Sequence, residues 1–190
     1  MLFLSAQILS GKIFASEFKE EAKKQVLALK EQYNITPGLA VIIVGENPAS
    51  KVYVNNKHRT CEEVGIYSEV ISMPADTTKE QLIAKIDELV QLPLPEAIAK
   101  EEADILNAIC PLKDVDGFHP VNVGKLMIGQ DDGMIPCTPY GCLKMLQSAK
   151  INIDGAHAVI VGRSNIVGKP MGQLLLAQNA TVTICHSHTH

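Results

Sequence analysis

The 190-residue chain lacks the features that would point to a membrane or to a nucleic-acid partner. Basic residues are not in excess, because 17 Lys and Arg stand against 21 Asp and Glu and give a net charge of −4. Nucleic acid and anionic membrane surfaces therefore have no electrostatic support as partners. No apolar run reaches the roughly 18 residues that a membrane helix needs. The apolar N-terminus is short and has no basic segment before it, so we expect no signal peptide.

Cysteines are few, and their spacing shows neither a disulfide framework nor a metal site. The chain has five, an odd number, and no Cys-x-x-Cys pair. This pattern favours reduced thiols in a cytoplasmic protein and gives no support to a structural zinc ion. Hydrophobic residues make up 46% of the chain, enough for a core in one sizeable domain or two small ones.

The spacing of apolar residues predicts an α/β fold. Apolar residues at helical spacing indicate amphipathic helices, and a short continuous apolar run is typical of a parallel strand covered on both faces. The helices expected in the first 110 residues are at 11–33, 50–65 and 97–109, with a further one that starts within 76–80, has Thr77 or Thr78 as cap and ends before Val90. The expected strands are at 39–45 and 67–73.

Tyr53 and Lys57 are the first candidate catalytic residues. They are four residues apart on a predicted helix, so both side chains lie on one face, one turn apart. Lysine is the cation that burial most readily turns into a proton donor or acceptor, and a neighbouring phenol can orient it. The helix follows the carboxyl end of a predicted strand, where open α/β sheets place their ligands. The alternative is a surface helix with a solvated Lys57 and a half-buried Tyr53.

Gln91 is a second candidate. It is followed by Pro93 and Pro95, and two prolines so close cannot lie inside a central strand. We therefore expect Gln91 at a strand end or in a loop, facing the same crevice as Lys57. The alternative is a polar turn residue without a role in chemistry.

Asp114 and Asp116 lie in a dense polar loop, where alternation would point both side chains the same way. Too few other carboxylates are near to complete the ligand shell of a hard cation. One carboxylate binding a ligand N–H group is therefore favoured over a metal site. Capping of the loop itself is the alternative.

The last part of the chain predicts a strand–loop–helix–strand unit, the first half of a mononucleotide-binding fold. The loop from Gly162 to Gly168 departs from the GxGxxG pattern, because Ser164 replaces the middle glycine. The helix that follows is expected at 170–178, and its N-terminal N–H groups could bind phosphate. A further helix is expected at 139–148, before this unit.

The end of the next strand favours NADP over NAD. An NAD-binding fold commonly has a carboxylate there for the ribose 2′-hydroxyl, but this chain has His186-Ser187-His188. No carboxylate would repel a 2′-phosphate, and Arg163 and Ser187 could bind one. The alternating histidines could also suggest a metal cluster, which is the less favoured interpretation because they lie at the end of the chain.

Five motifs occur in order along nearly the whole chain. They are Tyr53-Val-Asn-Asn-Lys57, Val90-Gln-Leu-Pro-Leu-Pro95, Lys113-Asp-Val-Asp-Gly-Phe-His-Pro-Val-Asn122, Pro136-Cys-Thr-Pro139 and Gly162-Arg-Ser-Asn-Ile-Val-Gly-Lys-Pro170. Together they resemble the bifunctional methylenetetrahydrofolate dehydrogenase/methenyltetrahydrofolate cyclohydrolase family. The resemblance implies an N-terminal folate-binding catalytic α/β domain, residues 1–137, followed by the first part of an NADP-binding Rossmann-type domain, residues 138–190.

The resemblance also implies an activity and a set of site residues. The activity is NADP-dependent oxidation of 5,10-methylenetetrahydrofolate and hydrolysis of the methenyl product to 10-formyltetrahydrofolate, in one-carbon metabolism. Lys57 would be the catalytic residue, with Tyr53 near the folate and Gln91 positioning Lys57. The binding residues would be Asp116 for the pterin amino group and Gly162, Arg163, Ser164 and Ser187 for NADP. A cytoplasmic homodimer without a metal ion is expected.

Two departures from the family pattern support an alternative function. Leu89 runs directly into Val90 and Gln91, where the family has a turn and the start of a core strand. The chain also ends at His190, where the family continues through more of the nucleotide-binding sheet. The alternative is a catalytically inactive fragment that binds folate or associates with itself through open sheet edges. Such a fragment would be poorly soluble and would melt without cooperativity.

Overall fold

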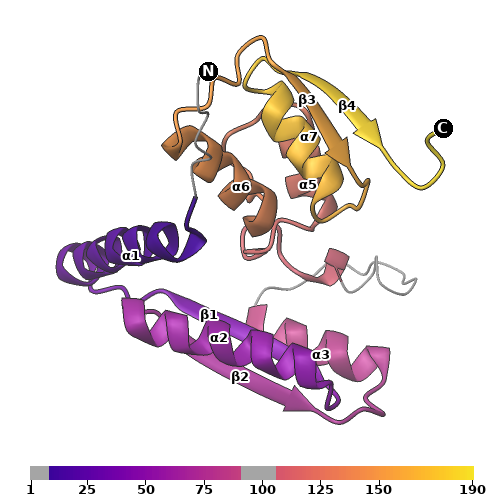
Figure 1. Ribbon diagram of the computed structural model, residues 1–190. Helices are drawn as coiled ribbons and strands as arrows, with labels where there is room; N and C mark the ends of the chain where they lie inside the picture. The colour runs from indigo at the N-terminus through magenta and orange to yellow at the C-terminus, as the bar shows by residue number, and fades with distance from the viewer. Residues whose placement is uncertain (1–8, 91–105) are drawn as a thin grey trace. The chain divides into compact units, whose positions relative to one another are not determined.

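The computed structural model describes residues 9–90 and 106–190, which form two compact units (Figure 1). The first unit ends at Leu82 and the second begins at Ile83. Gln91 and residues 97–105 of the predicted helix lie outside the described residues. The predicted domain boundary between residues 137 and 138 stays a prediction.

The first unit is a helix followed by a strand–helix–strand arrangement. Its elements are α1 (Gly11–Tyr33), β1 (Gly38–Val44), α2 (Pro48–Val64) and β2 (Tyr67–Met73). The two strands are parallel and pair over their full length, from Gly38 with Tyr67 to Val44 with Met73. Helix α2 contacts both strands and α1. The predicted parallel strands and the intervening helix are therefore confirmed. The expectation that the first strand is covered on both faces is wrong for the described residues, since Ile43 is the one fully buried residue of β1.

Local sequence fixes both ends of α2, the helix that carries Tyr53 and Lys57. At the start, the Asn47 side chain accepts hydrogen bonds from the backbone N–H groups of Ala49 (2.9 Å) and Ser50 (3.2 Å). Pro48 takes the first helical position, where no N–H group is needed. At the end, Gly65 adopts a φ of 86°, a left-handed conformation that suits glycine. The helix therefore has a defined length and a defined face toward the strands.

Helix α3 (Lys79–Val90) begins at the end of the first unit and continues into the second. Thr78 caps it, as one of the two predicted alternatives. The Gln81 N–H group donates to the Thr78 hydroxyl (3.3 Å), and the Thr78 N–H group donates to the Gln81 side chain (2.9 Å). This reciprocal pair is a capping box.

The second unit contains two helices and a second strand–helix–strand arrangement. Its remaining elements are α5 (Pro120–Met127), α6 (Cys137–Ser148), β3 (His157–Val161), α7 (Gly168–Leu176) and β4 (Thr181–Cys185). Strands β3 and β4 are parallel, from His157 paired with Thr181 to Val161 paired with Cys185. A core formed by α6, α7 and the start of β4 holds the unit together: Leu143, Met171, Leu174, Leu175 and Ala180.

Helices α6 and α7 each begin two residues before the predicted start. The prediction placed Pro139 and Pro170 at the start of their helices, but each proline is the third residue of its helix. The first turn of a helix leaves its N–H groups without intrahelical partners, so proline fits at any position of that turn.

Candidate active site and nucleotide site

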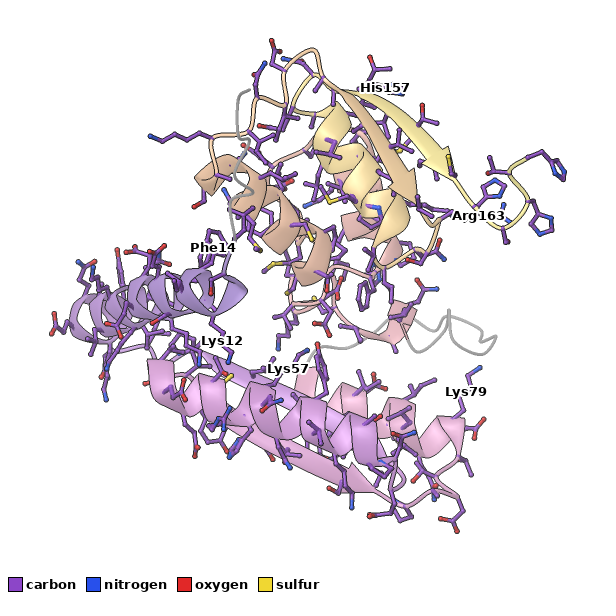
Figure 2. The ribbon with its side chains drawn as sticks, viewed as in Figure 1. Lys12, Phe14, Lys57, Lys79, His157 and Arg163 are labelled. Atoms are coloured by element: carbon purple, nitrogen blue, oxygen red, sulfur yellow. The ribbon has the colours of Figure 1, made fainter. Side chains whose placement is uncertain are left out.

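Tyr53 and Lys57 meet on α2, as their spacing predicted. The Lys57 Nζ atom lies 4.9 Å from the centroid of the Tyr53 ring, within the range of a cation–π interaction. Tyr53 is 59% exposed, whereas Lys57 is half-buried. Figure 2 labels the Lys57 side chain on α2. The alternative expected a solvated lysine beside a half-buried tyrosine, and the structure shows the opposite: the lysine is half-buried and the tyrosine is exposed.

The partial burial of Lys57 follows from its place on the helix. The buried residues of α2 are Val54, Cys61 and Val64, and the helix packs against both strands and α1. Lys57 is three residues after Val54 and four before Cys61, so it falls on the same stripe of the helix. A long side chain at such a position can bury its methylene groups while its ammonium group reaches outward. The sequence thus places an ionisable group where helix geometry predicts an apolar one.

Cys61 is a titratable residue on the buried side of α2, four residues after Lys57. Burial raises the pKa of the Cys61 thiol, and the nearby Ser68 hydroxyl and the positive charge of Lys57 lower it by less. The thiol is therefore held in its neutral form, which is a poor nucleophile. Of the groups on this part of α2, the lysine remains the candidate for proton transfer.

The two aspartates of the polar loop differ in their surroundings. Asp114 is buried and accepts hydrogen bonds from the backbone N–H groups of Gly117 (3.0 Å) and His119 (2.9 Å) and from the Asn122 side chain (2.9 Å). Asp116 is half-buried. The alternation argument is wrong here, because this segment forms hydrogen-bonded turns rather than an extended strand. Asp114 takes the loop-capping role, and Asp116 remains the candidate ligand-binding carboxylate.

The loop between β3 and α7 is shaped by a close backbone contact. A Cβ atom on Gly168 would lie 2.3 Å from the carbonyl oxygen of Gly162, so only glycine fits at this position. Gly162 itself has a φ of 130°. Without side chains at these two positions, the loop turns tightly and exposes backbone, the geometry that pyrophosphate groups need.

The Ser164 side chain binds two backbone amides at the start of α7. Its hydroxyl accepts hydrogen bonds from the N–H groups of Val167 (3.1 Å) and Gly168 (3.3 Å), and its carbonyl accepts one from Lys169 (3.0 Å). The next residue, Pro170, has no N–H group. Arg163 is exposed (Figure 2), so the charge available at this loop comes from a side chain rather than from the start of the helix.

The residues after β4 form a turn in which Ser187 is exposed. The N–H group of His186 donates to the Thr189 hydroxyl (2.8 Å), and the N–H group of His188 donates to the His186 ring (3.1 Å). Within residues 9–90 and 106–190, no three His, Cys, Asp or Glu side chains gather as a metal site. In the same part of the chain, no helix is long and apolar enough to span a membrane.

Sequence reasoning missed the two residues that hold the Asp116 loop together, His119 and Asn122. His119 caps α5 through its ring nitrogen, which accepts a hydrogen bond from the Val121 N–H group (3.1 Å). Asn122 is almost completely buried within that helix. The signal was the His-Pro pair, since Pro120 marks the first position of a helix and the residue before it is then the cap.

These features define an α/β protein with a catalytic part, which carries a half-buried lysine, and a partial nucleotide-binding part. Two family models match it: the tetrahydrofolate dehydrogenase/cyclohydrolase catalytic domain over residues 9–116, and the NAD(P)-binding domain of the same enzymes over residues 136–190. The chain belongs to the tetrahydrofolate dehydrogenase/cyclohydrolase family. Oxidation of methylenetetrahydrofolate and hydrolysis of methenyltetrahydrofolate are the activities that the comparisons support for it.

Individual relatives agree with the family models. The bifunctional protein FolD of Halalkalibacterium halodurans is 53% identical, over 98% of this chain and 69% of the relative. The bifunctional FolD enzyme of Campylobacter jejuni has a solved structure with a TM-score of 0.90 and 44% identity, over 97% of this chain and 68% of that one. The Trypanosoma brucei enzyme, solved with NADP and an inhibitor, has a TM-score of 0.87 and 33% identity, over 97% and 65%.

The chain therefore spans about two thirds of the length of these relatives. The alignment with the H. halodurans protein also runs over 196 positions, more than the 190 residues of this chain. That relative thus has residues within the matched region that this chain lacks. This agrees with the expectation that residues are missing from this chain within the family pattern.

Proposed function

We propose that Lys57 is the proton donor and acceptor of the cyclohydrolase step. Water adds to the methenyl carbon of a cationic substrate, and the hydrated ring then opens, so protons must be taken up and released near neutral pH. Partial burial and the positive charge of the bound substrate both favour the neutral form of a lysine. The observation that carries this proposal is the half-buried Lys57 side chain, whose ammonium group lies 4.9 Å from the centroid of the Tyr53 ring.

Tyr53 has an orienting role in this proposal. Its ring restricts the directions that the Lys57 ammonium group can take. Because Tyr53 is also largely exposed, its ring can stack on a planar pterin. Gln91, which lies outside the described residues, is proposed to position Lys57 further.

The dehydrogenase step depends on positioning rather than on proton transfer. NADP, when bound, accepts the hydride from the methylene carbon. The loop fits such a cofactor, because Gly168 packs against the Gly162 backbone and so allows a tight turn, and Arg163 adds an exposed positive charge. Gly162, Arg163, Ser164 and Ser187 are the proposed cofactor contacts, and Asp116 is the proposed partner of the pterin amino group.

NADP is proposed over NAD because of the charge near the nucleotide. Arg163 supplies a cation, and the turn after β4 has exposed Ser187 without a carboxylate beside it. An acidic residue at that place would select the free ribose hydroxyl of NAD. The related Trypanosoma brucei enzyme was solved with NADP, which supports the same choice.

The proposal for Lys57 predicts a separation of the two activities. Lys57→Met keeps most of the apolar stem but removes the titrating group. Cyclohydrolase activity should fall by about 10²–10⁴-fold, the contribution of one acid/base group. Dehydrogenase activity should fall less, through poorer orientation of the folate. The two half-reactions are measured separately, as NADPH formation and as loss of methenyltetrahydrofolate absorbance.

Lys51→Met is the matched control for this experiment. Lys51 lies on the same helix, is exposed and forms an ion pair with Glu46. Its replacement should leave both activities near the parent level. If Lys57→Met kept cyclohydrolase activity near that level too, Lys57 would be an ordinary helix lysine and the proposal would be wrong.

An inactive folate-binding or self-associating module is the second candidate. It is favoured by the exposed apolar residues of β3, where Val159 is 58% and Val161 is 88% exposed. The same activity assays distinguish the two candidates, because a module of this kind would bind tetrahydrofolate without turnover.

A cytoplasmic location is proposed because all five cysteines are free thiols. The proposed homodimer is tested by sedimentation.

A further inference from the structure

The strongest feature outside the proposed contacts is the buried carboxylate of Asp114. Its side chain accepts three hydrogen bonds, from the N–H groups of Gly117 and His119 and from the amide of Asn122. Two of these donors belong to the backbone immediately after Asp116. The direction of the chain at Asp116 is therefore set by the side chain of a residue two positions before it.

Asn122 links this carboxylate to two other segments. Its side-chain amide also donates to the carbonyl of Pro111 (2.9 Å), and its side-chain oxygen accepts from the N–H group of Met134 (3.3 Å). One buried asparagine thus joins the start of the loop, the Asp114 carboxylate and the segment before α6. All of its polar atoms have partners within this network, so it holds a single geometry.

Gly117 fixes the other side of Asp116. It has a φ of 70°, and a Cβ atom at this position would lie 2.7 Å from the carbonyl oxygen of Met134. The backbone next to Asp116 therefore packs directly against the backbone of the segment that Asn122 also binds. Asp116 is held between a buried hydrogen-bonded carboxylate and a close backbone contact.

We propose that Asp114, acting with Asn122, is a positioning residue that fixes the Asp116 carboxylate for the folate substrate. This rests on the proposed role of Asp116 as the partner of the pterin amino group. A carboxylate that binds a planar ligand must be held within a fraction of an ångström of its productive place. Neither Asp114 nor Asn122 needs to touch the substrate, because both act through the loop.

The test replaces the acceptor without changing its size. In Asp114→Asn, one oxygen becomes an amide group, so a donor faces N–H donors in the network. We expect the KM for 5,10-methylenetetrahydrofolate to rise about tenfold, the value of a lost hydrogen bond to a charged group. The KM for NADP should stay within twofold, and kcat should change less than the folate KM.

A second variant and a stability control keep the test sharp. Asn122→Ala leaves Asp114 two of its three donors and should raise the folate KM by a smaller factor. If Asp114→Asn does not fold, the folate KM of Asn122→Ala tests the proposal instead. Ile153→Ala weakens the core of the same unit away from the loop. It should lower the melting temperature without changing the folate KM, so loss of stability alone would not reproduce the expected result.

Asp116→Asn distinguishes a failure of the positioning role of Asp114 from a failure of the proposed folate-binding role of Asp116. If Asp116→Asn raises the folate KM while Asp114→Asn and Asn122→Ala leave it within twofold, Asp116 binds the folate but needs no positioning, and the inference is wrong. If Asp116→Asn itself has no effect on folate binding, the proposed role of Asp116 and the inference are both overturned.

Discussion

Two strand–turn–helix junctions in this chain begin alike and end differently. Each starts with glycine, a charged residue and a polar residue: Gly45-Glu46-Asn47 after β1 and Gly162-Arg163-Ser164 after β3. In each, the glycine N–H group donates to the last residue of the next strand, Gly45 to Met73 (2.9 Å) and Gly162 to Cys185 (2.7 Å). The same hydrogen bond thus ends both parallel sheets.

The junctions differ in how soon the helix begins. Asn47 is itself the cap, so α2 follows at once and its first amides are satisfied. Ser164 caps from three and four residues away, so a loop forms before α7 and Gly168 must pack against Gly162. The charged residue is negative in the first junction and positive in the second. Glu46 forms an ion pair with Lys51, whereas Arg163 is exposed. The first junction supports a helix with chemistry on its body, and the second forms a loop suited to an anion.

The glycines should show the largest difference between the junctions. Gly168→Ala places a methyl group against backbone and should lower the free energy of unfolding by about 3 kcal/mol. It should also raise the KM for NADP at least tenfold. In Gly45→Ala the new methyl group would make ordinary contacts with Ala75, at 3.4 Å from its Cβ atom. The cost is therefore that of a left-handed alanine, about 1 kcal/mol. Urea unfolding followed by circular dichroism compares the two. Equal losses would mean that the Gly168 contact is not tight.

Arg163→Ala tests whether the charge at the second junction selects the cofactor. The preference for NADP over NAD should narrow by about 1–3 kcal/mol, because a charge-assisted contact with the 2′-phosphate is lost. The ratio of kcat/KM values for the two cofactors measures the change. Glu46→Ala alters the corresponding charge of the first junction and should leave that ratio unchanged. Equal use of both cofactors by the parent chain would contradict the charge argument.

The two caps should differ in their effect on binding rather than on stability. Asn47→Ala removes the acceptor for two α2 amides and should lower the free energy of unfolding by about 1 kcal/mol. Ser164→Ala should cost a similar amount. Only Ser164→Ala should also change the KM for NADP, because its hydroxyl shapes the loop. If Asn47→Ala changed that KM and Ser164→Ala did not, the two junctions would have been assigned the wrong roles.

The smallest of the expected effects concerns Cys61, which lies on α2, the helix of the first junction. Because burial raises its pKa, the folded state holds the thiol proton more tightly than the unfolded state. The resulting stability is present below the unfolded pKa and is lost as pH rises through the folded pKa. Alkylation by iodoacetamide should be slower at Cys61 than at exposed Cys137 at every pH up to that point. Mass spectrometry of peptides reads both sites; equal rates would show that Cys61 is accessible.

Periodicity predicted the elements that bury an apolar face, and it failed where hydrogen bonds decide the backbone. The parallel strands and α2 follow from spacing alone. The separate surroundings of Asp114 and Asp116 do not, because turns have no alternation. The hydrogen bonds of Ser164 could not be predicted either. In the sequence, a serine at this position only weakens the glycine motif, whereas in the structure its hydroxyl accepts hydrogen bonds from the N–H groups of Val167 and Gly168.

The position of Lys57 on the buried stripe of α2 has a consequence for directed evolution. Neighbours Val54 and Cys61 favour an apolar residue there, so Lys57→Met and Lys57→Leu should fold at least as stably as the parent. A library screened only for heat resistance should therefore enrich apolar residues at position 57 and discard the cyclohydrolase. A library screened for growth on one-carbon metabolites should keep lysine and accept the lower melting temperature.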